Sequence, residues 1–153
     1  MTVTLRPVAP SDCDLICRHR YDMFQAAGDQ EAAKAALSPA YREWQQNALQ
    51  SAAYFGFIAE VGRVAVGGVG LMVIDWPPHH LHPDVLQRGY VLNVFVEPAH
   101  RGKGIAKSLM VASDDAFKAR GITHAVLTAT DQARPLYERD GWRQTAQMAK
   151  ELR

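Results

Sequence analysis

The chain has 153 residues, 48% hydrophobic and 22% charged, which are the proportions of a globular domain and not of a disordered chain. Its 17 basic and 16 acidic residues leave a net charge of +1, which argues against electrostatic binding of nucleic acid. No apolar run reaches the roughly 20 residues of a membrane span, and the first residues lack the pattern of a secretory signal. We therefore expect a single domain over residues 1–153 in the cytoplasm, with neither nucleic acid nor membrane as a partner.

The first half of the chain predicts two helices followed by a hairpin. Residues 2–8 alternate as a strand, residues 9–28 and 37–51 carry the spacing and caps of helices, and residues 53–61 and 64–76 form two strands around a tight turn. The glycines within the second of these strands indicate a bulge or the close approach of another backbone. Cys13 and Cys17 match neither a CxxC motif nor a disulfide framework, so we expect two reduced, partly buried thiols.

The second half predicts a proline-rich loop and then alternating strands and helices. The loop covers residues 77–89, and it is followed by a strand over 90–98, a helix over 104–120, a strand over 123–130, a short helix over 131–141 and a final strand over 142–152. The whole order is β-α-α-β-β-β-α-β-α-β. Consecutive strands favour antiparallel pairs, whereas the strand–helix–strand unit favours a parallel crossover. The expected fold class is α/β (α+β), with a mixed, mostly antiparallel central sheet flanked by helices.

A glycine-rich turn stands between the strand over 90–98 and the helix over 104–120. It reads Arg101-Gly102-Lys103-Gly104. Unpaired backbone N–H groups and the positive end of the helix dipole meet at such a junction, so an anion can be held there. The two glycines allow the anion to approach the backbone, and the two cations add charge. The plainer alternative is a sharp turn with two solvated cations, and the spacing fits neither a Walker loop nor a dinucleotide fingerprint.

Two motifs of the chain resemble those of the GNAT superfamily of acyl-CoA-dependent N-acyltransferases. The segment from Arg101 to Ala106 is similar to the signature Q/R-x-x-G-x-G/A, and "ARPLYERDGW" is similar to the segment A-x-x-x-Y-E-x-x-G-F, with Ala133, Tyr137, Glu138, Gly141 and Trp142 in register. The element order matches over essentially the whole chain. The resemblance implies a GNAT fold, acetyl-CoA as co-substrate without a metal, a small-molecule or peptide amine as acceptor, and a homodimer.

The resemblance also implies roles for individual residues. The pyrophosphate would lie on backbone amides of the glycine turn, and the pantetheine arm would pair with the strand before it, in a slot where two strands part. The implied cofactor contacts are Asn93, Val94, Phe95, Val96, Arg101, Gly102, Lys103, Gly104, Ile105, Ala106 and Thr130. Tyr137 would donate a proton to the departing thiolate. A lysine-like amine with a pKa near ~10.4 must first lose a proton, at a cost of about 4–5 kcal/mol, whereas a thiol with a pKa of about 8.5 needs only modest acid help.

The chain departs from the family pattern at two points. Thr130 stands where many members have Asn, and its hydroxyl could bond the pantetheine or cap the short helix. The strand that often carries an acidic general base holds only Glu97, beside the turn, so no base is assigned. Asn93 could instead satisfy a neighbouring group at a bulge, and Tyr137 could be a packing aromatic.

The loop before Tyr90 carries His79, His80 and His82. These could bind a metal, help to deprotonate the acceptor, or simply be solvated, and we expect no metal because a closed zinc site needs about four well-spaced ligands. Weak acceptor-side candidates are Arg88, Tyr90, His79 and His80. The expected function is N-acetyl transfer to a primary amine, and the alternatives are a catalytically silent CoA-binding sensor and an interaction domain that keeps the fold without the cofactor.

Overall fold

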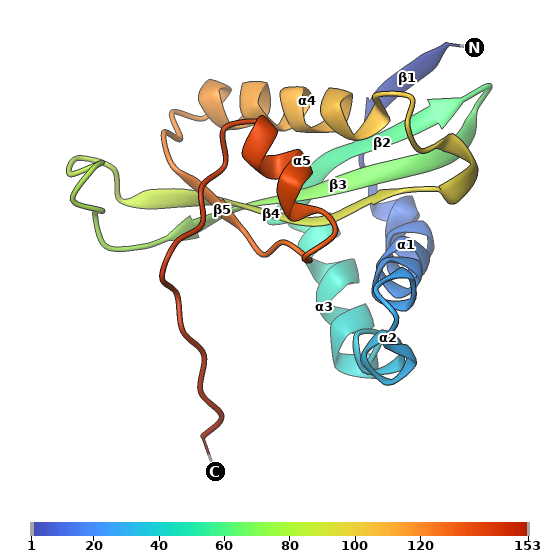
Figure 1. Ribbon diagram of the computed structural model, residues 1–153, viewed down its shortest axis with the longest axis horizontal. Helices are drawn as coiled ribbons and strands as arrows, with labels where there is room; N and C mark the ends of the chain where they lie inside the picture. The colour runs from blue at the N-terminus through green and yellow to red at the C-terminus, as the bar shows by residue number, and fades with distance from the viewer. Residues whose placement is uncertain (1, 153) are drawn as a thin grey trace.

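The computed structural model describes residues 2–152 and contains a five-stranded sheet (Figure 1). The strands are β1 (Val3–Pro7), β2 (Phe55–Val61), β3 (Val64–Asp75), β4 (Gln87–Val96) and β5 (Ala125–Leu127), and they lie side by side in this order. Neighbours pair antiparallel except β4 and β5, which pair parallel. The predicted mixed, mostly antiparallel sheet and its parallel crossover are thereby confirmed.

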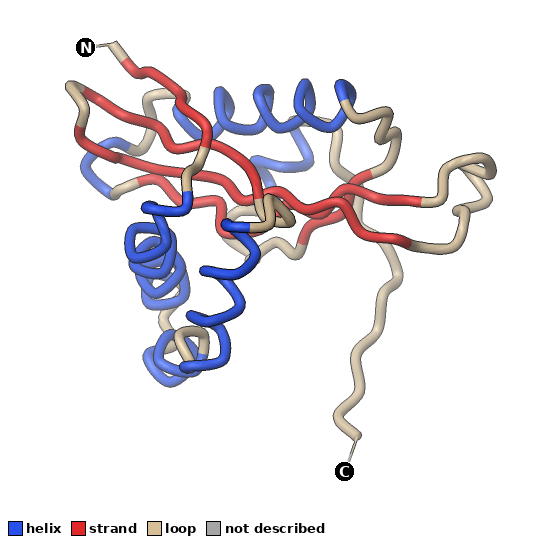
Figure 2. Tube along the Cα trace, turned by 180° about the vertical axis from the view of Figure 1, so that it is seen from behind, coloured by secondary structure: helices blue, strands red, loops and turns tan. Residues whose placement is uncertain are grey.

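Helices cover both faces of the sheet (Figures 1 and 2). On one face lie α1 (Cys13–Ala26), α2 (Gln30–Ala35) and α3 (Pro39–Gln50), and on the other lie α4 (Ile105–Ala119) and α5 (Arg134–Arg139). Single 3-10 turns occupy Pro10–Asp12 and Pro98–His100. The sequence did not predict α2, whose six residues are too few to show helical periodicity. Within the described residues, none of the helices has both the length and the hydropathy needed to cross a bilayer.

Two hydrophobic cores hold these layers together. The larger one lies between the sheet and α4 and includes Leu71, Val91, Leu109 and Phe117. The smaller one lies on the opposite face, where α1 and α3 pack on the sheet through residues such as Ile16 and Leu49. Cys13 and Cys17 are buried in this smaller core and are unpaired, as predicted. Burial raises the pKa of the Cys17 thiol to about 11, so this thiol stays protonated at neutral pH.

The glycines of β3 lie at a bulge and at places where neighbouring groups approach closely, the two alternatives that the sequence offered. The register between β3 and β4 shifts between Gly68 and Gly70, which is a bulge. A Cβ at Gly67 would lie 2.7 Å from the carbonyl oxygen of Phe95, and a Cβ at Gly70 would lie 2.1 Å from the hydroxyl oxygen of Tyr54. Neighbouring groups therefore come closer at these two positions than any side chain would allow.

The predicted final strand over 142–152 is wrong. These residues form no helix or strand; they pass beside β5 and α5, and the end of the segment extends away from the sheet (Figures 1 and 2). A strand needs a partner for its backbone hydrogen bonds, and β5, the outermost strand beside this segment, has only three residues. Gly141, with φ of +91°, ends α5 and redirects the chain. We call residues 142–152 the C-terminal arm.

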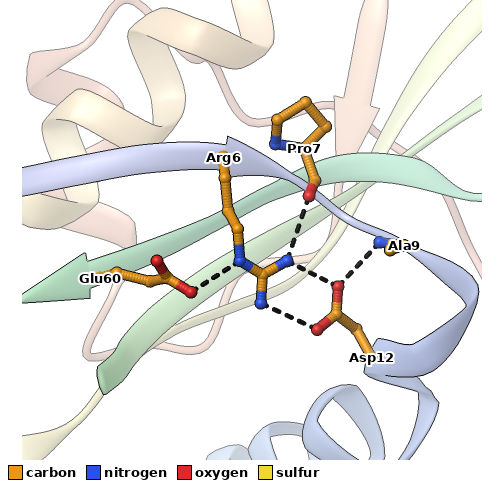
Figure 3. Close-up of polar contacts among 5 residues, drawn as sticks. All are labelled: Arg6, Pro7, Ala9, Asp12 and Glu60. Atoms are coloured by element: carbon orange, nitrogen blue, oxygen red, sulfur yellow. Dashed lines mark hydrogen bonds and ion pairs between the residues drawn. The ribbon is translucent and has the colours of Figure 1, made fainter. Parts of the chain in front are cut away.

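An ion-pair network fixes the entry of the chain into α1 (Figure 3). The Arg6 guanidinium donates two hydrogen bonds to the Asp12 carboxylate, at 2.8 and 2.9 Å, and a third to Glu60 at 2.6 Å. The backbone N–H of Ala9 also donates to Asp12, at 2.7 Å. Burial alone would raise the pKa of Asp12, but the hydrogen bonds from Arg6 and Ala9 outweigh it and lower this pKa below its usual value. The network therefore ties β1 to both β2 and the start of α1.

We expect this network to make the protein sensitive to acid. Because the pKa of Asp12 is lower in the folded state, its contribution is present above the unfolded pKa of about 3.9 and is lost as the pH falls through the folded value. Asp12→Ala should lower the free energy of unfolding at pH 7 by about 2 kcal/mol. Urea titrations between pH 2 and pH 7 should show a smaller loss on acidification for Asp12→Ala than for the wild type. Parallel curves would contradict the assignment.

Candidate active site

The two parallel strands, β4 and β5, part toward the carboxyl end of β4. Pairing between β4 and β5 runs only from Gly89 opposite Ala125 to Val91 opposite Leu127. Two residues further on, Asn93 adopts the left-handed conformation with φ of +55° and lies within the bulge opposite β3. β4 continues five residues beyond this pairing, to Val96, while β5 ends at Leu127. The slot that the family resemblance implied is therefore present.

A cavity of about 410 Å³ lies at this slot. Ten predicted site residues line it: Val94, Phe95, Val96, Arg101, Gly102, Gly104, Ile105, Ala106, Thr130 and Tyr137. Other residues complete the lining: Met23, Ala26 and Ala27 at the end of α1, His100 and Lys107 on either side of the glycine turn, and Gln132, Ala133 and Leu136 around the start of α5. Ala133 belongs to the second motif, and the sequence predicted no site role for the others. Asn93 and Lys103 do not belong to this lining. One cavity thus unites the glycine turn with Tyr137, which lie more than thirty positions apart in the sequence.

The glycine turn and the start of α4 form one end of the cavity. Gly102 and Gly104 have φ of +75° and +79°, and a Cβ at either position would meet nothing within 4 Å. The space above the turn is therefore open to a ligand. The first amides of α4 have no acceptor within the helix, so they and the helix dipole favour a negative group there.

Of the two cations of the turn, Arg101 lines the cavity and Lys103 does not. Arg101 Nε donates to the carbonyl of Val96 at 2.9 Å, and the exposed Lys103 Nζ donates to the carbonyl of Ala99 at 3.2 Å. Lys107, in the first turn of α4, also lines the cavity. Lys107 is three residues after Gly104, so it lies within the first turn of the helix that the sequence predicts.

The second motif builds the other wall of the cavity. Tyr137 lies on α5, and its ring packs edge-on against Trp142 with the centroids 6.3 Å apart. The N–H of Trp142 donates to the Tyr137 carbonyl at 3.0 Å, directly after the turn at Gly141. Thr130 Oγ accepts from the N–H of Ala133 at 3.2 Å, so the hydroxyl caps the turn into α5. Burial raises the pKa of Tyr137, which keeps its hydroxyl protonated at neutral pH.

Asn93 directs its side chain away from the cavity, toward the α1–α3 face. Its Oδ1 accepts from Arg20 at 3.0 Å, and its Nδ2 donates to the hydroxyls of Tyr41 and Tyr54 at 3.1 and 3.3 Å. The Arg20 guanidinium in turn lies 4.2 Å from the centroid of the Tyr41 ring. The side chain of Asn93 therefore satisfies neighbouring groups at a bulge, and its contact with a cofactor stays a prediction limited to its main chain.

The weak acceptor-side candidates lie at the other end of β4. Val96 lies nine positions after Gln87, so at a rise of about 3.3 Å per residue the two ends of the strand are about 30 Å apart. Arg88 stacks over Trp76 at 4.4 Å from the ring centroid, and His79 stacks on both His80 and His124 at 4.2 and 5.0 Å. The structure does not bring Arg88, Tyr90, His79 or His80 into the cavity of Tyr137. Within residues 2–152, no group of three or more His, Cys, Asp or Glu side chains is arranged to hold a metal ion.

The mixed five-stranded sheet with helices on both faces places the protein among the α/β folds. The model of the acetyltransferase (GNAT) family matches residues 18–142. The chain belongs to the acetyltransferase (GNAT) family, and this membership supports acetyl transfer in general terms.

Solved structures agree with this assignment. The GCN5-related N-acetyltransferase from Ralstonia eutropha JMP134 is 43% identical over 99% of both chains, with a TM-score of 0.94. A predicted acetyltransferase from Clostridium acetobutylicum, solved with acetyl-CoA, is 23% identical over 99% of this chain and 96% of its own, with a TM-score of 0.85. An aminoglycoside acetyltransferase from an uncultured soil sample is 19% identical over 99% of both chains, with a TM-score of 0.74. The last two share the fold alone. No curated protein matches the sequence.

Proposed function

We propose that the protein is an N-acetyltransferase that moves the acetyl group of acetyl-CoA to a primary amine by direct attack in a ternary complex. The observation that carries the proposal is the single cavity shared by the glycine turn and Tyr137. The Clostridium relative solved with acetyl-CoA supports this choice of co-substrate. The open space above Gly102 and Gly104 and the free amides of α4 fit the phosphates of such a molecule.

Each part of the cavity has a role in this proposal. Acetyl-CoA supplies the activated thioester. The glycine turn holds the phosphates, and Lys107 adds a positive charge beside them. The neutral amine attacks the thioester carbon, so that a C–N bond forms and the C–S bond breaks. Tyr137 gives its proton to the departing sulfur and regains one from water. The amine releases its proton to water, because no Asp or Glu side chain lines the cavity.

The missing carboxylate also favours the second candidate, a silent sensor that binds CoA without chemistry. Release of free thiol separates the two. We would incubate the protein with acetyl-CoA and a panel of small amines, amino acids, aminoglycosides and short peptides, and measure thiol release with a chromogenic reagent. Acceptor-dependent release supports the enzyme, whereas tight CoA binding without release by any amine supports the sensor.

Acetyl-CoA should raise the melting temperature of the protein, because a ligand that binds only the folded state stabilises it by mass action. At 100 times the dissociation constant this amounts to about 2.7 kcal/mol, or about 5–10 °C for a chain of this size. Gly104→Val should abolish the shift by filling the space above the turn. Gly121→Val is the matched control, because Gly121 also has a positive φ, of +71°, with nothing within 4 Å of a Cβ, but lies outside the cavity. Equal shifts in both variants would contradict the assigned site.

A homodimer is the oligomeric state that we propose. The C-terminal arm is extended, and its Met148 and Leu152 side chains are 93% and 87% exposed, so it offers a second copy unpaired backbone and apolar surface. Light scattering at high micromolar concentration should give twice the chain mass of 16.9 kDa, and a chain ending at Trp142 should be monomeric. A monomeric full-length chain would count against the dimer.

A further inference from the structure

Four histidines from two distant parts of the chain meet beside the loop that joins β3 to β4. His79, His80 and His82 belong to this β3–β4 loop, residues 76–86, and His124 directly precedes β5. The His79 ring stacks on those of His80 and His124, with centroids 4.2 and 5.0 Å apart, and the His82 and His124 centroids are 4.9 Å apart. We call these four residues the histidine cluster. The proposed acetyl transfer gives it no role.

The histidine cluster connects the β3–β4 loop to the start of β5. β5 pairs with β4 over only three residues, and just before this pairing the N–H of Gly89 donates to the carbonyl of His124 at 2.8 Å. On the loop side, the His124 ring packs against His79 and His82, and the Thr123 hydroxyl lies 3.3 Å from His82 Nδ1. The rings of the cluster therefore add to the short backbone ladder that fixes this end of β5.

One hydrogen bond defines the protonation state of His79. The backbone N–H of Leu81 donates to His79 Nδ1 at 3.1 Å, and a backbone N–H can only donate. Nδ1 is therefore unprotonated, and the proton of the neutral ring lies on Nε2. A second proton at Nδ1 would break the bond to Leu81 and would place a cation against two neighbouring imidazoles.

The charges around the cluster disfavour this second proton. Arg88, on β4, acts as a positive charge on both His79 and His124. The two acids at this end of the hairpin, Asp75 and Asp84, border a cavity together with Arg120. Beyond His124, the charged side chains that border two further cavities balance each other: Asp114, Glu138 and Asp140 against Lys118, Arg134 and Arg143. Among the ion pairs of residues 2–152, the one that includes a histidine joins His19 to Glu97, outside the cluster.

We propose that the histidine cluster is a pH-sensitive clamp: neutral imidazoles hold the β3–β4 loop against the start of β5, and their protonation releases it. Partial removal from water lowers the pKa of His79 and of His124, and the charges of neighbouring histidines and Arg88 lower it further. The clamp is therefore closed above the unfolded pKa of about 6.5 and opens as the pH falls through the lower values of the folded chain. This inference does not depend on acetyl-CoA binding.

Hydrogen exchange of the full chain, followed by NMR, tests the clamp. After correction for the intrinsic pH dependence of exchange, protection of the Leu81 and His82 amides should fall about 10-fold between pH 7.5 and pH 5.5, because uptake of one proton shifts the equilibrium tenfold per pH unit below about 6.5. His124→Phe keeps a ring in the stack without a charge, so its fall should be smaller. His124→Arg is charged at every pH, so its loop should already be open at pH 7.5. His100→Gln, outside the cluster, is the histidine control, and its loop should respond as in the wild type.

The outcomes decide between a clamp and four independent solvated histidines. Equal protection of the wild type at the two pH values overturns the proposal. An equal fall in the wild type and in His124→Phe, or a closed loop in His124→Arg at pH 7.5, overturns the role of charge in the cluster. Titration of the imidazole ring protons needs no variant: His79 and His124 should titrate below pH 6.5, and midpoints at or above that value would contradict the clamp.

Discussion

Tyr137→Phe is expected to lower the turnover number by roughly 10²-fold, the low end of the 10²–10⁴ range for loss of a general acid, because a thiolate is already a fair leaving group. The phenyl ring keeps its packing against Trp142, so the melting temperature and the dissociation constant of acetyl-CoA should hardly change. Steady-state kinetics with saturating co-substrate, together with calorimetry, measure the two effects separately. Because burial raises the pKa of Tyr137 above its ordinary value of about 10, the wild type should not lose activity through this group as the pH rises to 10.

Tyr21→Phe is the matched control for this change. Tyr21 lies on α1, outside the cavity, so removal of its hydroxyl should leave turnover unchanged. A Tyr137→Phe variant with near-wild-type turnover would assign the proton to water or another group, and the tyrosine would then have only its packing role. A weaker binding of acetyl-CoA with unchanged turnover would indicate a contact with the pantetheine arm.

Asn93→Ala is expected to be the most destabilising single substitution considered for this protein. Alanine at a φ of +55° costs about 1–2 kcal/mol. Loss of the amide also removes the bonds to Arg20, Tyr41 and Tyr54, which adds about 2 kcal/mol. Denaturation in urea should therefore give a free energy of unfolding lower by about 3–4 kcal/mol.

Asn93→Gly separates the two contributions. Glycine adopts a positive φ freely, so this variant should lose the hydrogen bonds and keep the backbone geometry. We expect it to be about 1–2 kcal/mol more stable than Asn93→Ala. If the two variants are equally stable, the left-handed conformation at Asn93 is not under strain, and if Asn93→Ala loses less than about 1 kcal/mol, the network does not stabilise the bulge.

The parts of the fold that the sequence predicted are those governed by local rules. The helix over 104–120, the hairpin at Gly62-Arg63 and the glycine turn depend on neighbouring residues, and the structure shows them within a few residues of the expected bounds. An anion site could be predicted at Arg101–Gly104 because a strand end, two glycines and a helix start are adjacent in the chain. Tyr137 could be added only through the second motif.

The parts that could not be predicted depend on contacts between distant segments. Asn93 meets Arg20 and Tyr54, 73 and 39 positions away, and no local pattern indicates such a meeting. His100 and Lys107 flank the glycine motif, but whether their side chains turn into the cavity depends on the path of the backbone. The prediction of a strand over the C-terminal arm was wrong because a strand also needs a neighbouring strand that accepts its hydrogen bonds, and the local sequence pattern does not show whether one is present.

The contact between Gly70 and Tyr54 limits the order in which mutations can accumulate in this lineage. A Cβ at Gly70 would lie 2.1 Å from the Tyr54 hydroxyl oxygen and 2.3 Å from the ring carbon that carries it. Any larger residue at position 70 would therefore displace the ring and release Asn93 on the next strand. An ancestor could replace Tyr54 first and then accept a side chain at position 70, whereas the reverse order passes through a damaged intermediate. In an alignment of homologues, positions 54 and 70 should vary together, and saturation mutagenesis of position 70 should accept larger residues only in a background with a small residue at position 54.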